Sequence, residues 1–279
     1  MSTATDSARD TMQRLFVLNR SVPSAERYGE IQAIEARWLA PIVAEKSATA
    51  PRLESARDFA ALMEASIDED EAAGREAASF IANDATREQL GAIVAEYAID
   101  GLTEAQNFFP AIPRLPIRAQ MAVMRVLIDE FGCGNLRRAH SELYVDLLRE
   151  LDLPLDLSTH LRSVSGETLA FVNSFFWLAS RAPDVEYFLG ALAYLEAYIP
   201  TGFACFDAAC RRIGIEHGLY YSEHMHIDDF HKQELQVAIH EVDRATGCDF
   251  SKLWVGMALL RRVLGDSFLA AVDRAQALR

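Results

Sequence analysis

The amino-acid sequence predicts an all-α protein that folds as a single helical bundle. Ala, Leu, Glu and Arg, which favour helices, are frequent, whereas alternating runs of Val, Ile and Thr are scarce. The expected helices are long and their connections are short, as in bundles. With 279 residues, of which 51% are apolar, the chain can bury a large core. No internal repeat or low-complexity linker interrupts it, so we expect one domain over residues 1–279.

Apolar residues at helical spacing predict the helices in order, and prolines mark the breaks between them. Residues 1–20 precede the first helix, and the sequence leaves open whether they are flexible. Three prolines in "PAIPRLP" separate the third helix from the fourth, and Pro154 followed by Ser158, a good N-cap, precedes the sixth. "RAPD" and "RATGCD" end two further helices. The expected helices are residues 24–46, 54–82, 85–109, 117–131, 135–151, 158–181, 184–213, 216–243 and 250–278.

Charge and cysteine usage exclude several classes of partner. The net charge is −14 and Lys and Arg form no block, so the surface repels nucleic acid and anionic membranes. Cys133, Cys205, Cys210 and Cys248 show no CxxC spacing, which indicates reduced thiols. The N-terminus, "MSTATDSARD", has no basic region followed by an apolar run, so no signal peptide is expected. These features favour a cytoplasmic protein.

The most apolar segment, residues 169–199, is interrupted by polar residues. Arg181, Pro183, Asp184 and Glu186 stand near its middle. A membrane span needs about 20 consecutive apolar residues. We therefore expect two buried helices here and no membrane span.

The stretch "YSEHMHIDDFHKQE" (residues 221–234) gathers histidines and acidic residues on one expected helix. At about 100° per residue, His224, Asp228 and His231 fall on the stripe that also carries the apolar residues, while His226, Asp229 and Glu223 face outward. Burying an ionisable group without a partner costs a few kcal/mol. A single histidine here would be explained by a protein partner, but three such groups favour a bound cation.

Two other interpretations of this stretch stay open at this point. Glu223 and His226 form a Glu-x-x-His pair, of the kind that carboxylate di-iron bundles use. Their poor alignment with the apolar stripe makes them the weaker choice. The inward-facing groups could also be satisfied by protein partners alone.

Three more ionisable residues lie in apolar stripes of other expected helices: Glu104, Glu130 and His140. On the expected helix of His140, Leu136 falls on the same apolar stripe and Arg137 falls near its edge. A single buried glutamate could pair with an arginine such as Arg125 or Arg138. Together with the stretch above, however, these residues supply three carboxylates and three imidazoles. That set favours iron or manganese over structural zinc, which is usually tetrahedral and often bound by Cys.

The spacing of Glu130 and His140 requires a break in the helix. Ten residues of ideal helix would separate them by ~15 Å, too far for ligands of adjacent ions. The sequence between them, "FGCGN", contains Gly132 and Gly134. Two glycines in three residues break a helix readily. We therefore predict an interrupted helix at residues 132–135.

The ordered set Glu104, then "DEFGCGNLRRAHSELY", then "HMHIDDFH" resembles the haem-oxygenase-like di-iron oxidases and oxygenases. These are iron-containing redox enzymes with a TenA/haem-oxygenase-like helical fold. The resemblance implies two non-haem iron ions, O2 as co-substrate and an external electron donor. We expect Glu104, His140 and His231 mainly on one iron and His224 and Asp228 mainly on the other, with Glu130 bridging. The implied metal ligands are Glu104, Glu130, His140, His224, Asp228 and His231.

Two residues are candidates for contact with substrate. As the resemblance implies, nitrogen-oxygenating members can carry a carboxylate three residues before the first-motif histidine, where this chain has Arg137. That feature does not support nitrogen oxygenation, and Arg137 could instead meet a substrate carboxylate or pair at the surface. Glu196, a charged residue in an apolar helix, could support a ligand, act as a seventh ligand, anchor an amine or pair with an arginine.

Aromatic residues are expected to enclose the centre and keep water out. Each of them is more simply explained as plain core. The candidates are Phe108, Phe171, Phe175, Phe176, Trp177, Tyr194 and Phe203.

The leading hypothesis is an O2-dependent di-iron oxidoreductase of specialised metabolism that acts on a small amine or amino acid. The reaction would be C–H or C–C oxidation, fragmentation, or N-oxygenation. One alternative keeps the irons and takes a fatty acid, which is decarboxylated or desaturated. Another is a metal-free helical binding or regulatory protein, and a ferritin-like iron store is disfavoured because it needs paired Glu-x-x-His motifs. The sequence leaves a homodimer open.

Overall fold

The computed structural model describes the backbone of residues 2–278 and the side chains of residues 7–226 and 230–278. Every regular element in this part of the chain is helical, which confirms the predicted fold class. The short elements are a π-helix η1 (Phe80–Asp84) and the 3-10 helices η2 (Phe109–Arg114), η3 (Gly132–Gly134) and η4 (Leu136–Arg138). The α-helices are α1 (Ser2–Asn19), α2 (Ala25–Thr49), α3 (Ala56–Ser79), α4 (Arg87–Gly101), α5 (Ile117–Glu130), α6 (His140–Glu150), α7 (Leu157–Ser163), α8 (Gly166–Ser180), α9 (Val185–Ile213), α10 (Leu219–Thr246) and α11 (Phe250–Gln276).

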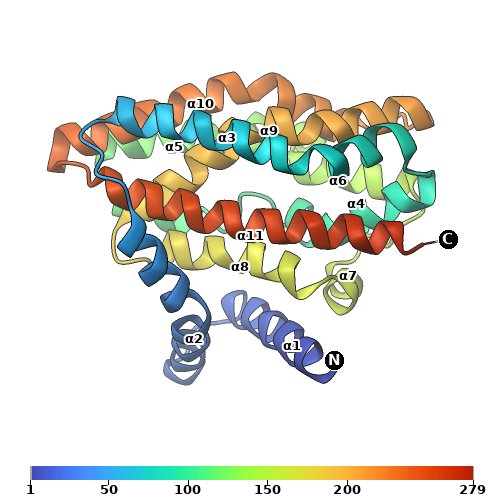
Figure 1. The fold of residues 1–279 in the computed structure, drawn as a ribbon, viewed down its shortest axis with the longest axis horizontal. Coiled ribbons are helices and arrows are strands. Elements are labelled where there is room, and N and C mark those ends of the chain that lie inside the picture. The colour runs from blue at the N-terminus through green and yellow to red at the C-terminus, as the bar shows by residue number, and fades with distance from the viewer. Residues whose placement is uncertain (1, 279) are drawn as a thin grey trace.

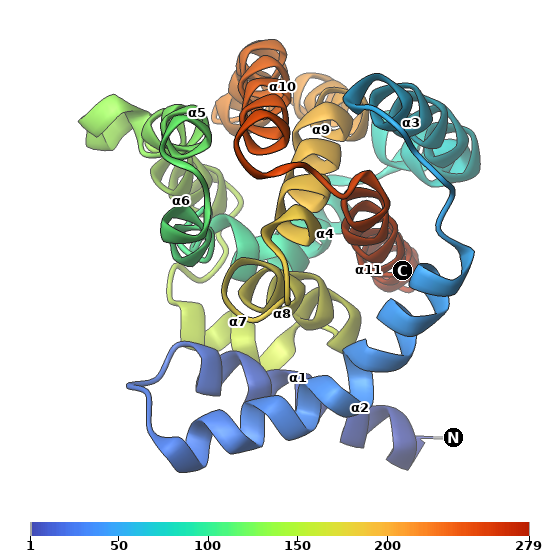
Figure 2. The same cartoon turned by 90° about the vertical axis from the view of Figure 1, so that its left-hand side faces the viewer.

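Helix α9 lies in the middle of the bundle, and α10 and α11 pack along it (Figure 1). The view along the helices shows α5 and α6 beside α10 on one side and α3 on the other (Figure 2). Helices α1 and α2 form a separate layer below α8, against which α1 packs (Figure 2). The functional residues described below come from the upper part, where α4, α5, α6, α9 and α10 meet.

The apolar character of α9 follows from this central position. Its buried residues run from Tyr187 to Cys210 and include Phe188, Leu192 and Tyr194. By length and composition, α9 is also the one helix in the described chain that could cross a membrane; 50% of its most apolar window is buried within the protein, and core helices of soluble proteins pass the same test. The segment expected to form two buried helices thus forms α8 and the first half of α9.

The structure corrects several expected boundaries. Residues 2–19, which the sequence left unassigned, form α1. The helix expected over 158–181 is two helices, because Val164 is extended and Ser165 caps α8 by accepting from Thr168 N. The N-cap of α7 is Asp156, not Ser158, and it accepts from Thr159 N.

The predicted break between Glu130 and His140 is confirmed. Helix α5 ends at Glu130 and α6 begins at His140. Gly132 and Gly134 have φ of 62° and 82°, and Cys133 between them has φ of 52°, so the chain reverses in the left-handed region. The reversal brings the two ends of α5 and α6 together, and Glu130 Oε2 lies 2.9 Å from His140 Nδ1.

Candidate metal centre

Glu104 reaches the centre from an irregular turn. The helix expected over 85–109 ends at Gly101, and Ala105, with φ of 60°, lies in the turn that follows. Oε1 of Glu104 accepts from the Tyr220 hydroxyl at 3.0 Å and lies 3.1 Å from His224 Nε2. Oε2 of Glu104 is buried and has no hydrogen-bond partner among the described atoms. Such an orphaned carboxylate oxygen is costly in a protein interior and is readily satisfied by a cation.

His224, on α10, faces Glu104 with its Nε2 atom. Its Nδ1 lies 2.7 Å from the carbonyl oxygen of Tyr220, so Nδ1 carries a hydrogen and donates it. In neutral imidazole, Nε2 then presents a lone pair to Glu104 Oε1 at 3.1 Å. Two acceptors at this distance need a proton or a metal ion between them. The residues therefore fit a metal, and without one the site must hold an extra proton.

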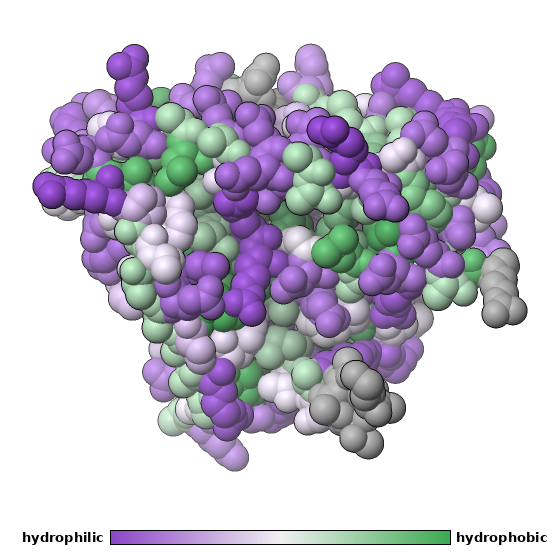
Figure 3. Space-filling model, viewed as in Figure 1, coloured by the Kyte–Doolittle hydropathy of each residue, from purple (hydrophilic) through white to green (hydrophobic). Residues whose placement is uncertain are grey.

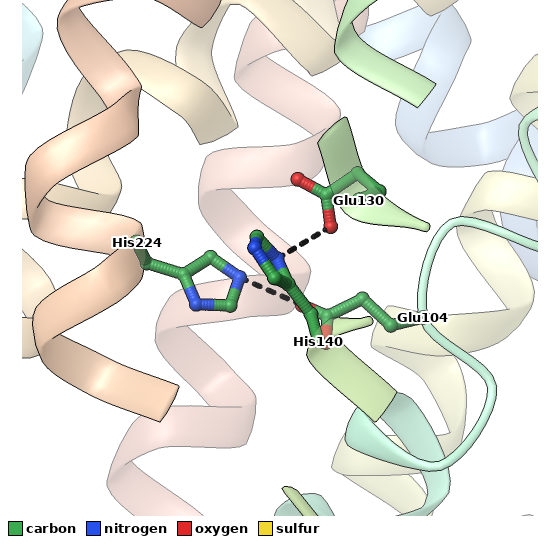
Figure 4. Close-up of side chains that lie close together, drawn as sticks. All are labelled: Glu104, Glu130, His140 and His224. Carbon is green, nitrogen blue, oxygen red and sulfur yellow. Dashed lines mark hydrogen bonds and ion pairs between the residues drawn. The ribbon is translucent and has the colours of Figure 1, made fainter. Parts of the chain in front are cut away.

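Four side chains from four parts of the chain converge here (Figure 4). His224 comes from α10, Glu130 from the end of α5, His140 from the start of α6, and Glu104 from the turn after α4. The ring centroids of His140 and His224 are 4.0 Å apart. One possible ligand atom from each of the four residues lies within 4.8 Å of the others. His140, His224 and Glu130 are buried, and 15% of the Glu104 side chain is exposed.

A second group shares Glu130 with the first. It consists of Glu130, Glu196 and His231, whose ligand atoms also lie within 4.8 Å of one another, and all three are buried. His231 Nδ1 is 2.9 Å from Glu196 Oε2 and 3.7 Å from Glu130 Oε1. The two groups differ from the expected partition, since His231 lies with Glu196 and Glu130, and His224 joins Glu104 and His140. Glu130, expected to bridge the two irons, belongs to both groups.

Burial and mutual repulsion shift the pKa values of these groups. Burial, together with the neighbouring Glu104 and Glu196, raises the pKa of Glu130 to about 8. Burial lowers the pKa of His140. For His224 and His231 burial acts in the same direction, but Glu104 and Glu196 outweigh it and raise both pKa values. Such opposed shifts in one buried cluster are typical of functional sites.

Four other polar residues of α10 belong to the stretch that the sequence singled out: Asp228, Asp229, His226 and Glu223. The side chain of Asp228, an expected ligand, lies outside the described residues, as does that of Asp229. His226 is exposed, as predicted. Glu223 pairs with Arg138 at 3.0 Å on the outside of the bundle, and neither residue of the competing Glu-x-x-His pair belongs to the two groups.

Arg137 is exposed in η4 and does not line the cavity described below. Leu136, expected on the same apolar stripe as His140, is 70% exposed. Both expectations extended the helix of His140 backwards, but α6 begins at His140, so helical angles do not apply to the residues before it.

Two carboxylates, those of Glu196 and Asp129, lie near His231. Glu196 was a candidate in several roles, and the structure places it against His231. Asp129, which the sequence did not single out, has Oδ2 3.7 Å from His231 Nε2. The only signal for it was its position next to Glu130, at the end of a helix expected to be distorted.

A cavity of about 210 Å³ opens beside Glu104. Of the aromatic residues expected to enclose the centre, Phe171, Tyr194 and Phe203 line it. Phe108 and Phe175 pack on each other in the core, with ring centroids 4.9 Å apart. Phe176 and Trp177 are half-buried against the same core. Part of the expected enclosure is therefore present, and the rest is core.

The fold and the site together define a helical bundle with a buried carboxylate–histidine centre suited to first-row metals. Residues 92–259 match the family model described as iron-containing redox enzyme. The match covers more than half of the chain, so the chain belongs to this family, and the resemblance inferred from the ordered motifs is confirmed.

One relative adds to this comparison. A nitrosourea synthase from Streptomyces achromogenes subsp. streptozoticus is 27% identical over 140 residues. The alignment covers 50% of this chain and 30% of the synthase, so the chain aligns with only part of that protein.

Proposed function

We propose that the protein is a non-haem di-iron enzyme that uses O2 to oxidise a small amine or amino-acid-like substrate in specialised metabolism, in the cytoplasm. The observation that carries the proposal is the pair of buried ligand groups that share Glu130. Membership of an iron-containing redox family and the nitrosourea synthase relative support it. The reaction class is oxidation at C–H or C–C, or at nitrogen as the name of the relative suggests.

The chain offers a ligand set for each of two irons. Glu104, His140 and His224 would hold one, His231 and Glu196 the other, and Glu130 would bridge them. Asp228, one helical turn after His224, is a further ligand by its position in the sequence. Bound iron would react with O2, and protein side chains alone cannot carry out that chemistry.

Electron balance requires a partner. Complete reduction of O2 takes four electrons, and a two-electron oxidation of the substrate supplies half of them. For such a two-electron oxidation, an external donor would supply the other two. The four carboxylates of this ligand set would favour the higher oxidation state of bound iron, so the oxidised centre would be stable until the donor reduces it.

The protein residues around the centre control protons and water. The carbonyl oxygen of Tyr220 fixes the tautomer of His224 and keeps Nε2 directed at Glu104. The Tyr220 hydroxyl donates to Glu104 at 3.0 Å, and burial raises the pKa of that hydroxyl well above its ordinary value. Tyr220 thus remains a hydrogen-bond donor across the working pH range. The largely apolar walls of the cavity would limit the access of water to a bound metal ion.

A metal-free binding protein is the second candidate, because each histidine also lies near a glutamate. The distances are 2.9 Å for His140 and Glu130, 3.1 Å for His224 and Glu104, and 2.9 Å for His231 and Glu196. Shared protons could satisfy the His224–Glu104 and His231–Glu196 pairs without iron, whereas His140 Nδ1, although close to Glu130, makes no hydrogen bond among the described residues.

Oxygen consumption tests the proposed function. The protein is loaded anaerobically with Fe(II), mixed with O2 in a stopped-flow instrument, and measured with and without a panel of small amines, amino acids and fatty acids. We expect at least one amine or amino acid to accelerate O2 consumption by the iron-loaded protein. No iron uptake would favour the metal-free protein, and acceleration by fatty acids alone would favour the decarboxylase or desaturase alternative.

A further inference from the structure

The cavity beside Glu104 has apolar walls and few charges. Most of its lining comes from α3, α4, α9, α10 and α11, and Phe203, Tyr220 and Tyr144 are among the lining residues. Small residues, Gly74 and Gly265, stand in its lining on α3 and α11. Figure 3, seen from the side on which α3 and α11 face the viewer, shows apolar side chains in the band between these helices, among hydrophilic neighbours. At about 210 Å³ the cavity is smaller than the roughly 300–1,000 Å³ of pockets for drug-sized ligands.

The charges in the lining are unbalanced towards the negative. Arg261 is the one cationic side chain among the described residues of the lining, and Asp70 already neutralises it through two hydrogen bonds of 2.7 Å. The Tyr194 hydroxyl also donates to Asp70, at 2.6 Å. Asp100 and Glu104 have no such counter-charge in the lining. Glu104 is a ligand of the proposed metal centre, so Asp100 is the carboxylate left for a ligand that enters this cavity.

Asp100 is the carboxylate that the metal centre does not use. It lies at the end of α4, four residues before Glu104, and belongs to neither ligand group. Its side chain makes no hydrogen bond or ion pair with any other described residue, although it is only partly accessible. Burial, followed by the repulsion of Glu104, raises the pKa of Asp100 to about 8. An unpartnered carboxylate in such a place gains much from a cationic ligand.

We propose that Asp100 binds the ammonium group of the substrate and so makes the enzyme selective for amines with an apolar or aromatic body. The inference rests on the proposed function, because it places the amine beside the iron centre. The ammonium donates hydrogen bonds to Asp100, and the body packs against the aromatic walls that Phe203 and Tyr198 provide. Asp100 and Glu104 line the same cavity, so the ammonium end of the substrate would lie towards the metal centre.

The same geometry disfavours fatty acids. A carboxylate bound within this cavity would face Asp100, and Arg261, the one cationic side chain among the described lining residues, is already paired with Asp70. Like charges at short range in a site of low dielectric are costly. The cavity charge thus distinguishes the amine hypothesis from the fatty-acid alternative.

Calorimetric titration of matched ligands tests this inference. The probes are phenethylamine, 2-phenylethanol and 3-phenylpropionate, which share a body and differ in charge, and each is titrated into anaerobic, iron-loaded protein. We expect the amine to bind at least tenfold more tightly than the alcohol, and the acid most weakly of the three. The Asp100→Asn variant keeps the shape of the side chain and should lose about ten- to hundredfold in affinity for the amine, with the alcohol unchanged.

Asp152→Asn is the matched control, since it removes the same charge from an exposed residue. Its affinity for all three probes should equal that of the wild type. Equal binding of amine and alcohol by the wild type would overturn the inference, whether or not the Asp100→Asn variant folds. An unchanged amine affinity in a folded Asp100→Asn variant would also overturn it.

The iron content of each sample is measured in parallel. Amine selectivity in a protein that takes up no iron would contradict the proposed function alone, whereas iron uptake without amine selectivity would contradict only the role of Asp100.

Discussion

Glu130 is the residue on which the proposed centre depends most, because its oxygens lie near both groups of ligand atoms. Replacing Glu130 with Ala removes a ligand from both groups, whereas replacing Glu196 removes one from the second group only. We expect Glu130→Ala to weaken the binding of both irons by about tenfold or more, and Glu196→Ala to weaken one. Iron per chain, measured with a colorimetric chelator after anaerobic loading and desalting, checks this order.

His226→Ala is the control for that series, since His226 lies on the same helix as His224 but is exposed. Its iron content should equal that of the wild type. Wild-type iron content in Glu130→Ala would show that the two groups do not share this residue as a ligand.

Arg181 and Glu35 form a buried ion pair that joins α2 to the end of α8. Arg181 donates to both carboxylate oxygens at 2.6–2.9 Å and to Asn19 at 2.8 Å, and the two side chains are 12% and 6% exposed. Burial raises the pKa of Glu35 despite the arginine. Arg181→Met leaves a buried charge without its partner and should lower the free energy of unfolding by about 3–5 kcal/mol at pH 8.

The effect of Arg181→Met should shrink as the pH falls. A carboxyl whose pKa is raised by folding binds its proton more tightly in the folded state, so stability rises as the pH falls through the folded pKa towards the unfolded value of 4.5. Losing Arg181 raises the folded pKa of Glu35 further. Urea unfolding at pH 8 and pH 5 should therefore show the larger loss at pH 8, and adding Glu35→Gln should recover part of it. A loss equal at both pH values would contradict the charge argument.

At the scale of elements, the sequence predicts faces well inside a helix and poorly beyond its ends. The angles on α10 correctly separate buried His224 and His231 from exposed His226. The same arithmetic fails for Leu136 and Arg137, which lie in η4 before α6 begins. The glycines at 132 and 134 identify the break itself because their conformational freedom is a local property.

The crossing of α9 and α11 depends on glycines at the contact. A Cβ atom on Gly256 would lie 1.9 Å from the carbonyl oxygen of Tyr187, and one on Gly190 would lie 1.9 Å from that of Leu253. Gly256→Ala must push two backbones apart and should destabilise the protein by about 2 kcal/mol or more. Thermal unfolding followed by circular dichroism measures the change.

Gly265, on the same helix, provides the matched control. A Cβ atom there meets nothing within 4 Å. Alanine at an open helical position stabilises by up to about 1 kcal/mol. The two substitutions should therefore shift the melting temperature in opposite directions, and a Gly256→Ala variant as stable as the wild type would contradict the close crossing.

At the scale of the whole molecule, the sequence predicts the helical bundle and most of the residues that meet in its centre, because burial patterns repeat along each helix. It does not predict which residues meet across helices. Asp129 and Glu196 reach His231 only through the packing of α5, α9 and α10, and Glu104 reaches His224 only because α4 ends early. These contacts depend on tertiary structure, which periodicity does not encode.

Metal binding should stabilise the whole fold, since the buried carboxylates repel one another without it. At a free metal concentration a hundredfold above its dissociation constant, binding contributes about 2.7 kcal/mol. Adding Fe(II) anaerobically, or Mn(II) as a redox-stable substitute, should raise the melting temperature by about 5 °C, and excess chelator should reverse the rise. A melting temperature that does not respond to either metal would argue that no ion occupies the centre.

The most direct test of the account is an anaerobic Fe(II) titration of the wild-type protein, with bound iron separated from free iron and counted per chain. Two ligand groups that share Glu130 predict saturation at about two equivalents, as in two-metal sites. Saturation near zero would show that glutamate–histidine pairs sharing protons occupy the interior, and the oxygen chemistry proposed for the protein would then be wrong.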